Sequence, residues 1–481
     1  MSFTDNTIPK GARVKDEGPK KEDKEMTVEE QLTKAKKPGQ DAMLMHPYYH
    51  GKIETVPKAC IRSFDDFSIW CSPGVAEPCK DIAKNPERVY DHTCKWNTVA
   101  VVSDGTRVLG LGDIGPEAAM PVMEGKAMLF KYLGGVDCVP ICLDTKDPEK
   151  IIETVRLIAP SFGGINLEDI SNPKCFDILD ALRADCKVPV WHDDQQGTAT
   201  VEVAGAMNAM KLVGKKFSDA NVAIVGAGAA CLAIARLLLA TGFNPNHICM
   251  CDSKGILNQS RNDIDEAHKL KRQICEKTNG AGKSGGIKEA MEGADLLIAA
   301  SQPGPGTIPP EYLDKMASDP VVFATANTIP EVWPWEAKEH GVKVFATGRS
   351  DFPNQVNNSM GFPAIFRGVL DVRAKTITDE MCIAAATELA RCAEEKGLRD
   401  DYIIPSMAEE SVYPREAAAV AMKAIEQGVA RLKPSYEEEL ENAQAIISRS
   451  RKLTSAMMHQ GFIKKYRDPN DKDDAFADLF E

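Results

Sequence analysis

Apolar and polar residues alternate along the chain in two series, each of which predicts short strands separated by helices. The first series has apolar runs at residues 98–102, 136–143, 164–167 and 188–191, with a helix expected at 121–132 and a further strand end at 108–116. The second series follows a long Ala-rich helix at 198–212, with apolar runs at 221–225, 247–251, 294–301, 321–324 and 342–346. This alternation predicts an α/β fold with two largely parallel sheets.

Polar or purely helical segments flank the two series. Residues 1–37 show almost no apolar periodicity, which predicts a disordered or loosely draped tail. Residues 376–432 are helical by period, and the polar residues from 434 onward predict one charged helix and an acidic tail. We therefore expect five regions, namely a tail (1–37), a first α/β domain (38–205), a second α/β domain (206–375), C-terminal helices (376–433) and a polar extension (434–481).

Composition limits the classes of function that the chain can have. A length of 481 residues exceeds one ordinary core and fits two domains. The formal net charge of -13 argues against nucleic-acid or anionic-membrane partners, since it leaves no basic face. Fourteen cysteines without zinc-finger spacing suggest reduced thiols. With no apolar stretch of transmembrane length and no signal-peptide hydrophobic region, we expect a cytoplasmic protein.

Two pairs of adjacent acidic residues follow predicted strands of the first series. Glu168 and Asp169 form one pair, and Asp193 and Asp194 form the other. Adjacent strand residues point to opposite faces, so Asp193 and Asp194 share a site only if the strand ends before them. Each pair alone is also typical of a solvated turn or a helix N-cap. Two such pairs at strand ends, without a His or Cys cluster, favour a Mg²⁺ or Mn²⁺ site.

The second series opens with a strand, a glycine-containing turn and an apolar helix. Gly226 permits a tight turn, and Gly228 lets the backbone approach a pyrophosphate at the helix N-terminus. The next strand ends at Asp252, near the spacing expected for an acidic residue that binds a ribose. Cys231 replaces the third glycine, so we expect slightly looser packing of the helix on the strand. The sequence predicts a Rossmann-type dinucleotide site with the turn residues Gly226, Gly228, Ala229 and Ala230.

The order of several motifs resembles the malic enzyme family, and more closely its shorter, prokaryotic-type branch. The resemblance covers about residues 46–432 and rests on motifs at residues 72–76, 109–115, 121–126, 166–169, 192–198 and 346–351. Malic enzymes oxidise L-malate with NAD(P)⁺ and decarboxylate the resulting oxaloacetate to pyruvate and CO₂. The resemblance implies a substrate and metal domain followed by a NAD(P)-binding Rossmann domain. It also implies an oligomer, which we expect to be a homodimer.

The resemblance also implies a role for each candidate site residue. Lys126, with a pKa lowered by burial near a divalent ion, would take the hydroxyl proton of malate as a base, and Asp193 would orient it. Without the resemblance, a lysine on a helix is more typical of a solvated face. The metal ligands would be Glu168, Asp169 and Asp194. Malate would be bound by Arg107, Asn327 and Asn358, with Asn327 also contacting the cofactor.

The chain departs from the family where the enolpyruvate carbon is protonated. The family uses the Tyr of a Tyr-(Thr/Ser)-Pro motif, and here Cys71 stands before Ser72 and Pro73. A thiol can donate this proton because its reference pKa of about 8.5 lies below that of tyrosine, but its reach is shorter. Tyr48, Tyr49 or water are the alternatives, since a thiol in apolar surroundings is usually inert.

The cofactor and the exact reaction stay open at this point. Asp252 favours NAD through the ribose hydroxyls, whereas Ser253 and Lys254 offer polar contacts and charge for a 2′-phosphate, so we expect NADP, with NAD possible. Further basic residues follow at Arg261, Lys269, Lys271 and Arg272. Two other functions compete, an oxaloacetate decarboxylase or reductase with weak malate turnover and a dinucleotide-binding protein that has lost catalysis.

Overall fold

The computed structural model describes residues 28–466, and the chain forms two compact units, residues 1–50 and 51–481. The described part of the first unit is α1 (Val28–Tyr49). The predicted tail is therefore wrong for residues 28–37, where Glu, Gln, Leu, Lys and Ala favour a helix even without an apolar face. The tails predicted for residues 1–27 and 467–481 lie outside the described residues.

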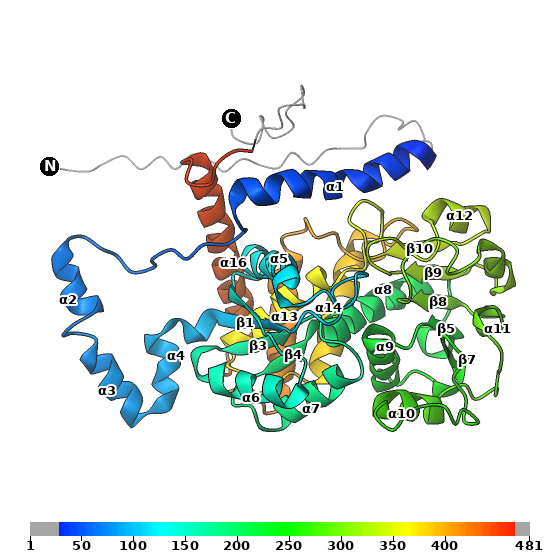
Figure 1. The fold of residues 1–481 in the computed structure, drawn as a ribbon, viewed down its shortest axis with the longest axis horizontal. Coiled ribbons are helices and arrows are strands. Elements are labelled where there is room, and N and C mark those ends of the chain that lie inside the picture. The colour runs from blue at the N-terminus through cyan, green and yellow to red at the C-terminus, as the bar shows by residue number, and fades with distance from the viewer. Residues whose placement is uncertain (1–27, 467–481) are drawn as a thin grey trace. The chain divides into compact units, whose positions relative to one another are not determined.

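The first sheet belongs to the second unit and has four parallel strands in the order β2-β1-β3-β4 (Figure 1). The strands are β1 (Thr98–Ser103), β2 (Asp137–Cys142), β3 (Gly164–Leu167) and β4 (Val190–His192), which confirms all four predicted strands. Successive residues of β1 point to opposite faces. Val99 and Val101 pack in the core that includes α5 (Pro116–Gly134), whereas Ala100 and Val102 pack with α6 (Pro148–Ile158) and α7 (Lys174–Asp185).

The second sheet has the order β10-β9-β8-β5-β6-β7, with all strands parallel except β7. Its strands are β5 (Val222–Val225), β6 (Ile248–Asp252), β7 (Gly255–Ile256), β8 (Leu296–Ala299), β9 (Val321–Ala324) and β10 (Val344–Thr347). The strand order reverses between β5 and β8, which is the topological switch point of a Rossmann-type sheet. The predicted doubly wound fold of the second α/β domain is confirmed.

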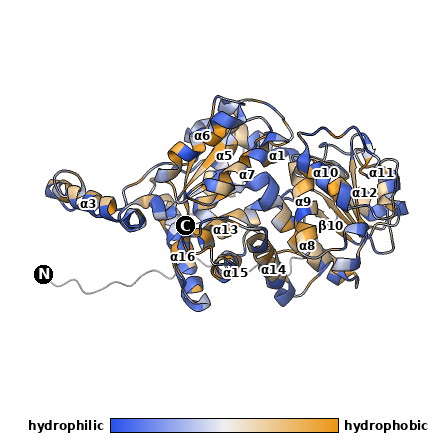
Figure 2. Ribbon diagram, turned by 90° about the horizontal axis from the view of Figure 1, so that it is seen from below, coloured by the Kyte–Doolittle hydropathy of each residue, from blue (hydrophilic) through white to orange (hydrophobic). Residues whose placement is uncertain are grey.

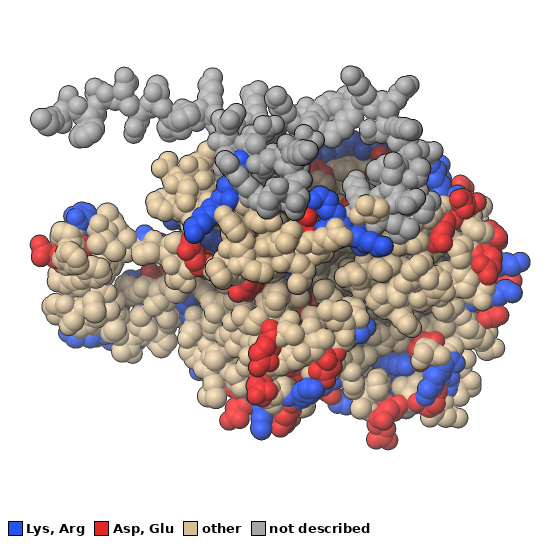
Figure 3. Space-filling model, turned by 45° about the horizontal axis from the view of Figure 1, so that its top comes forward, with Lys and Arg blue, Asp and Glu red and all other residues tan. Residues whose placement is uncertain are grey.

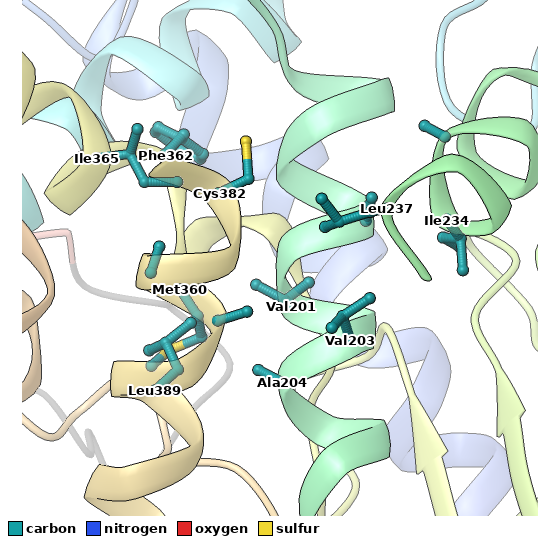
Figure 4. Close-up of a cluster of buried hydrophobic side chains, with 14 of the residues drawn as sticks. Val201, Val203, Ala204, Ile234, Leu237, Met360, Phe362, Ile365, Cys382 and Leu389 are labelled. Atoms are coloured by element: carbon teal, nitrogen blue, oxygen red, sulfur yellow. The ribbon is translucent and has the colours of Figure 1, made fainter. Parts of the chain in front are cut away.

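The helix α8 (Thr198–Leu212) leads from the first sheet into the second and has the predicted bounds. Most of its residues are buried, as expected for a helix that is apolar on all sides. In Figure 4, α8 stands between α9 (Ala229–Ala240), which carries Ile234 and Leu237, and α14 (Asp379–Lys396), which carries Cys382 and Leu389. Figure 2 shows α8 and α9 as largely hydrophobic.

The remaining helices complete the second unit. They are α2 (Phe67–Trp70), α3 (Ala76–Lys84), α4 (Val89–His92), α10 (Lys269–Lys277), α11 (Ile287–Met291), α12 (Pro334–Glu339), α13 (Phe362–Asp371), α15 (Val412–Glu426) and α16 (Tyr436–His459). The helix predicted after residue 434 is α16. Between residues 28 and 466, no helix is both long and apolar enough to cross a membrane.

One predicted strand end is wrong. Residues 108–116 form turns rather than a strand end, with a single bridge between Val108 and Gly112 before α5 begins at Pro116. Gly112 and Gly115 have φ values of 80° and 84°, which extended strands do not contain. The apolar residues of this stretch were misleading, since Leu109 and Leu111 are exposed.

A buried pair of carboxyl groups joins α16 to α13. Glu439 on α16 is buried and lies against Asp371, whose carboxylate accepts hydrogen bonds from Arg367 at 2.8 and 2.6 Å. Burial, together with the negative charge of Asp371, raises the pKa of Glu439 to about 9. Folded Glu439 therefore keeps a proton that the unfolded chain loses above about pH 4, so this group lowers the unfolding free energy as the pH rises from about 4 to 9.

The substitution E439Q removes this proton linkage, because glutamine stays neutral and still offers a donor to Asp371. We expect the two chains to have similar stability at about pH 5 and E439Q to be more stable by about 1–3 kcal/mol at about pH 8.5. Urea denaturation at both pH values measures the difference. A stability difference that does not change between these pH values would contradict this assignment of Glu439.

Candidate active site

Lys126 lies at the centre of a buried cluster of charges. It projects from the middle of α5, and its side chain is only 8% exposed, so the solvated helix face typical of lysine is not found here. Its Nζ donates to Asp193 Oδ2 at 2.5 Å and lies 3.0 Å from Glu168 Oε1. The Phe362 ring lies below the ammonium group, 4.4 Å from Nζ to the ring centroid. Lys126, Asp193 and Glu168 thus form one site.

The turn after β4 holds the Asp193 carboxylate in place. The strand ends at His192, and residues 193–197 form a single π-type turn before α8. The strand therefore ends before Asp193 and Asp194, which is the condition for their carboxylates to share one site. Trp191 Nε1 donates to Asp193 Oδ1 at 3.0 Å. A Cβ atom on Gly197 would lie 2.0 Å from the same oxygen, so any larger residue at position 197 would displace the carboxylate. The sequence motif contains Trp191 and Gly197, but only the fold shows that both residues hold the Asp193 carboxylate in place.

The three predicted metal ligands come together beside Lys126. One oxygen from each of Glu168, Asp169 and Asp194 lies within 4.8 Å of the others. The Asp169 backbone N–H donates to Asp194 Oδ2 at 2.8 Å, and Asn166 Nδ2 donates to Glu168 Oε2 at 2.9 Å. Asp169 Oδ2 is buried and has no hydrogen-bond partner among the described residues. An unpaired, buried carboxylate oxygen within an all-oxygen donor set fits a hard divalent cation.

The protonation of this cluster reflects burial and like charge. Burial raises the pKa of Asp169 to about 8, with the charge of Asp194 adding to the effect, and burial also raises the pKa of Glu168. Burial alone would lower the pKa of Lys126, but the charges of Asp193 and Glu168 outweigh it and the net shift is upward. The lowered pKa expected for Lys126 is thus not found in the protein alone, because two carboxylates lie against the ammonium group.

The dinucleotide turn has the predicted strand, turn and helix around it. Gly226 has a φ of 118°, and a Cβ atom there would lie 2.9 Å from Ala300 O, so position 226 requires glycine. A Cβ atom at Gly228 would have no atom of a non-neighbouring described residue within 4 Å, and α9 begins directly after it at Ala229 and Ala230. Cys231 is fully buried, and its thiol lies 3.5 Å from Ala300 O.

Asp252 ends β6 and is surrounded by cations. Its carboxylate accepts from Arg261 at 3.1 and 3.0 Å, from Lys271 at 2.5 Å and from the Lys254 backbone N–H at 2.8 Å. Burial opposes ionisation, but these hydrogen bonds outweigh it and lower the pKa of Asp252. Ser253 and the Lys254 side chain are exposed. Among the basic residues that the sequence suggested, Arg261 and Lys271 reach Asp252.

The predicted substrate residues lie on loops near these groups. The Arg107 side chain is exposed, and its backbone N–H donates to Asp169 O at 2.9 Å. Asn358 approaches Gly197, with 3.3 Å between its Cβ and the position of a Gly197 Cβ. The Asn327 carbonyl oxygen lies 2.5 Å from the position of a Gly110 Cβ, so the first-domain loop touches the second domain there.

Cys71 is not brought to the buried cluster within one chain. It follows α2, and its side chain is exposed. Tyr48 and Tyr49 belong to the first unit. Asn172 is a residue that the sequence did not predict, and its Nδ2 donates to Ala227 O at 3.3 Å, which joins the loop after Asp169 to the dinucleotide turn. Its only sequence signal was its position shortly after the acidic pair.

Two family descriptions and several known proteins match this chain. The family description "Malic enzyme, N-terminal domain" matches residues 50–183, and "Malic enzyme, NAD binding domain" matches residues 195–427. The "Bifunctional malic/malolactic enzyme" of Bacillus subtilis is 49% identical over 416 residues, which are 86% of this chain and 98% of that protein. The "NAD-dependent malic enzyme" of Geobacillus stearothermophilus is 50% identical over 81% of this chain and 79% of that protein.

Solved structures agree with these sequence matches. The crystal structure of Entamoeba histolytica malic enzyme has a TM-score of 0.90 and 45% identity, covering 92% of this chain and 93% of that one. A relative named "NADP-dependent malic enzyme", from Halomonas elongata, is 43% identical over 78% of this chain and 90% of that protein. The acidic cluster precedes the dinucleotide turn along the chain, just as the match to the N-terminal domain precedes the match to the NAD-binding domain. Together with the identity to known relatives, these matches show that the chain belongs to the malic enzyme family.

Proposed function

We propose that this protein oxidatively decarboxylates L-malate to pyruvate and CO₂, with reduction of NADP or NAD and with a requirement for Mg²⁺ or Mn²⁺. The observation that carries the proposal is the contact of buried Lys126 with both Asp193 and Glu168, beside the oxygens of Asp169 and Asp194. The names of the relatives support the same reaction.

The proton chemistry follows from the short contact between Lys126 and Asp193. Lys126 can accept the malate hydroxyl proton only as a neutral amine, and the 2.5 Å contact gives its own proton a route to Asp193 Oδ2. Trp191 and Gly197 hold Asp193 still while this happens. Glu168, Asp169 and Asp194 would hold the divalent cation, which when bound supplies Lewis-acid stabilisation of the oxygen that gains negative charge.

The position of the substrate follows from the loops around the cluster. Arg107 suits a bidentate contact with a malate carboxylate, because its guanidinium presents two parallel donors. Asn358 lies beside Gly197 and Asn327 lies beside Gly110, so the amide of each would be available to contact the substrate.

The exposed side chain of Cys71 favours a second candidate function. If no acid reaches the enolpyruvate carbon, the protein would still reduce oxaloacetate, which forms no enol, but it would turn malate over slowly and would decarboxylate oxaloacetate only as fast as water protonates the enol. A binding protein without catalysis is disfavoured, because the buried charges of Lys126, Asp193 and Glu168 are costly and a cofactor-binding role does not need them.

Metal-dependent NADPH or NADH formation from L-malate tests the main proposal. We expect turnover with Mn²⁺ that chelation abolishes and fresh Mn²⁺ restores, and a fall in kcat of about a thousandfold in K126M. K95M is the matched control, because Lys95 is also buried but donates to Ala159 O and Pro160 O, away from the cluster. Oxaloacetate turnover without malate turnover would select the second candidate, and no turnover of either acid would refute both.

We propose that NADP is the preferred cofactor. Two cations already occupy the Asp252 carboxylate, which leaves it poorly placed to accept ribose hydroxyls. Arg261, Lys271 and Lys254 outnumber Asp252 and Asp263 in this group by one positive charge, which suits a 2′-phosphate.

The substitution K271M tests this preference. We expect it to weaken NADP⁺ binding by about tenfold and to leave NAD⁺ binding nearly unchanged, since only NADP⁺ carries the 2′-phosphate. The control is K269M, because Lys269 pairs with Asp177 at 3.0 Å instead of Asp252. Binding is measured by titration calorimetry, and an equal loss for both dinucleotides would contradict the preference.

We also propose a cytoplasmic homodimer formed through residues 53–75. In residues 51–88, only Asp66 is buried, whereas eight large apolar side chains are exposed. They are Ile53, Val56, Ile61, Phe64, Phe67, Ile69, Trp70 and Val75. Figure 3 shows mostly uncharged side chains over this segment, at the left of the view. An apolar surface of this kind favours burial against a second copy. Cys71 lies within this apolar segment, so the environment of its thiol would depend on the dimer.

The double substitution F64E/I69E tests the interface. We expect the wild type to have twice the 52.4 kDa chain mass by light scattering and the variant to be monomeric, because the new charges cannot be buried.

Within the dimer, C71S should lower malate turnover by about a hundredfold if the thiol protonates the enolate. A monomeric wild type would refute the dimer, and an unchanged C71S would assign the proton to water or a tyrosine.

A further inference from the structure

Glu331 is a fully buried carboxylate that ties two loops together. Its Oε1 accepts from the Ser301 backbone N–H at 2.8 Å and from Ser301 Oγ at 3.0 Å, and its Oε2 accepts from the Ala326 backbone N–H at 3.2 Å. Ser301 follows β8 and Ala326 follows β9. One side chain therefore fixes the carboxyl ends of two neighbouring strands, where α/β sheets bind their ligands.

Both loops also lie close to other segments of the protein. Ala300, next to Ser301, has its carbonyl 2.9 Å from the position of a Gly226 Cβ, so this loop packs on the dinucleotide turn. Asn327, next to Ala326, has its carbonyl against Gly110 of the first domain. Glu331 thus links the loop that packs on the dinucleotide turn to the loop that contacts the first domain.

The strand order indicates which half of a dinucleotide the loops after β8 and β9 would contact. Asp252, with the cations proposed to bind the 2′-phosphate, ends β6, whereas β8 and β9 lie on the other side of β5. In this topology the dinucleotide crosses the switch point, with its adenosine toward β6 and its nicotinamide toward β8 and β9. The loops held by Glu331 therefore belong to the nicotinamide half.

A second carboxyl group lies behind Glu331. Glu202 on α8 is fully buried, and neither of its oxygens has a hydrogen-bond partner among the described residues. Burial raises the pKa of Glu202 to about 8 and that of Glu331 to about 7. Cys231 on α9 also faces the pair, and burial raises its pKa to about 12, so it stays neutral. Glu331 therefore gains its charge, which its three donors stabilise, as the pH rises through about 7, whereas Glu202 keeps its proton up to about pH 8.

We propose that Glu331 is a positioning residue that shapes the nicotinamide half of the cofactor site by holding the loops after β8 and β9. This inference rests on the proposed function in requiring that NADP⁺ binds to this protein. Glu331 itself is turned into the protein and acts through Ser301 and Ala326.

The test compares a whole dinucleotide with its adenylate half. We expect E331Q to weaken NADP⁺ binding by about tenfold, because its amide repels one of the N–H donors, and to leave 2′,5′-ADP binding within about twofold. S301A, which removes only the hydroxyl contact, should give a smaller loss with the same selectivity. Titration calorimetry on the wild-type and variant full chains measures both ligands.

A matched control separates this effect from general damage. E416Q changes another fully buried glutamate, on α15, whose oxygens have no hydrogen-bond partner among the described residues, in contrast to those of Glu331, and it should alter the binding of neither ligand. Wild-type NADP⁺ binding should weaken more steeply than that of E331Q as the pH falls below about 7, because Glu331 gains a proton there, whereas the 2′-phosphate, which titrates at about pH 6, affects both chains alike.

The outcomes distinguish this inference from the proposed function. Selective loss of NADP⁺ binding in E331Q and S301A supports the role of Glu331. An equal effect on both ligands, or none, overturns it while leaving dinucleotide binding intact. A wild-type chain that binds neither ligand overturns the cofactor part of the proposed function, and this inference with it.

Discussion

The cost of burying charge governs the first domain. Lys126, Asp193, Glu168 and Asp169 are all removed from water, and such groups are stable only when each has a partner. Lys126 satisfies two of the carboxylates directly, while Asp169 Oδ2 is left buried without a hydrogen-bond partner among the described residues. The indole of Trp191, the amide of Asn166 and the missing side chain of Gly197 all serve this cluster. A hydrophobic core would be cheaper, so the arrangement is better explained by chemistry than by stability.

The two sheets contribute different parts of the proposed active site, and a few contacts link them. Gly110 packs against the Asn327 carbonyl, and Asn172 donates to the Ala227 carbonyl in the dinucleotide turn. Both contacts join a loop of the first domain to a strand end of the second. The groups proposed for proton transfer and the groups proposed for the cofactor are thereby held in one frame, as hydride transfer between neighbouring ligands requires.

Much of this organisation was readable from the sequence, because period and turn chemistry are local. The apolar runs predicted nine of the strands, and the residues after Val225 and His192 predicted both functional turns. Local patterns failed where long-range contacts decide. The exposed Leu109 and Leu111 resembled a strand end, and the upward pKa shift of Lys126 depends on carboxylates that come from β3 and the turn after β4. The helix at residues 28–37 was missed because apolar periodicity reports packing and not helix propensity.

The helix α8 also determines how domains of this family can be recombined. Its first turn follows the acidic turn at Asp193, whereas its other end leads to Gly214, an exposed residue with a φ of 69°. A chimera that takes its dinucleotide domain from a relative should be joined at Gly214, since a junction near Gly197 would separate Asp193 from the residue that leaves room for it. The incoming domain must present apolar side chains that match Ile234 and Leu237, because those side chains cover α8 (Figure 4). Compatibility at one helix, rather than similarity across the whole domain, would then decide whether such a hybrid folds.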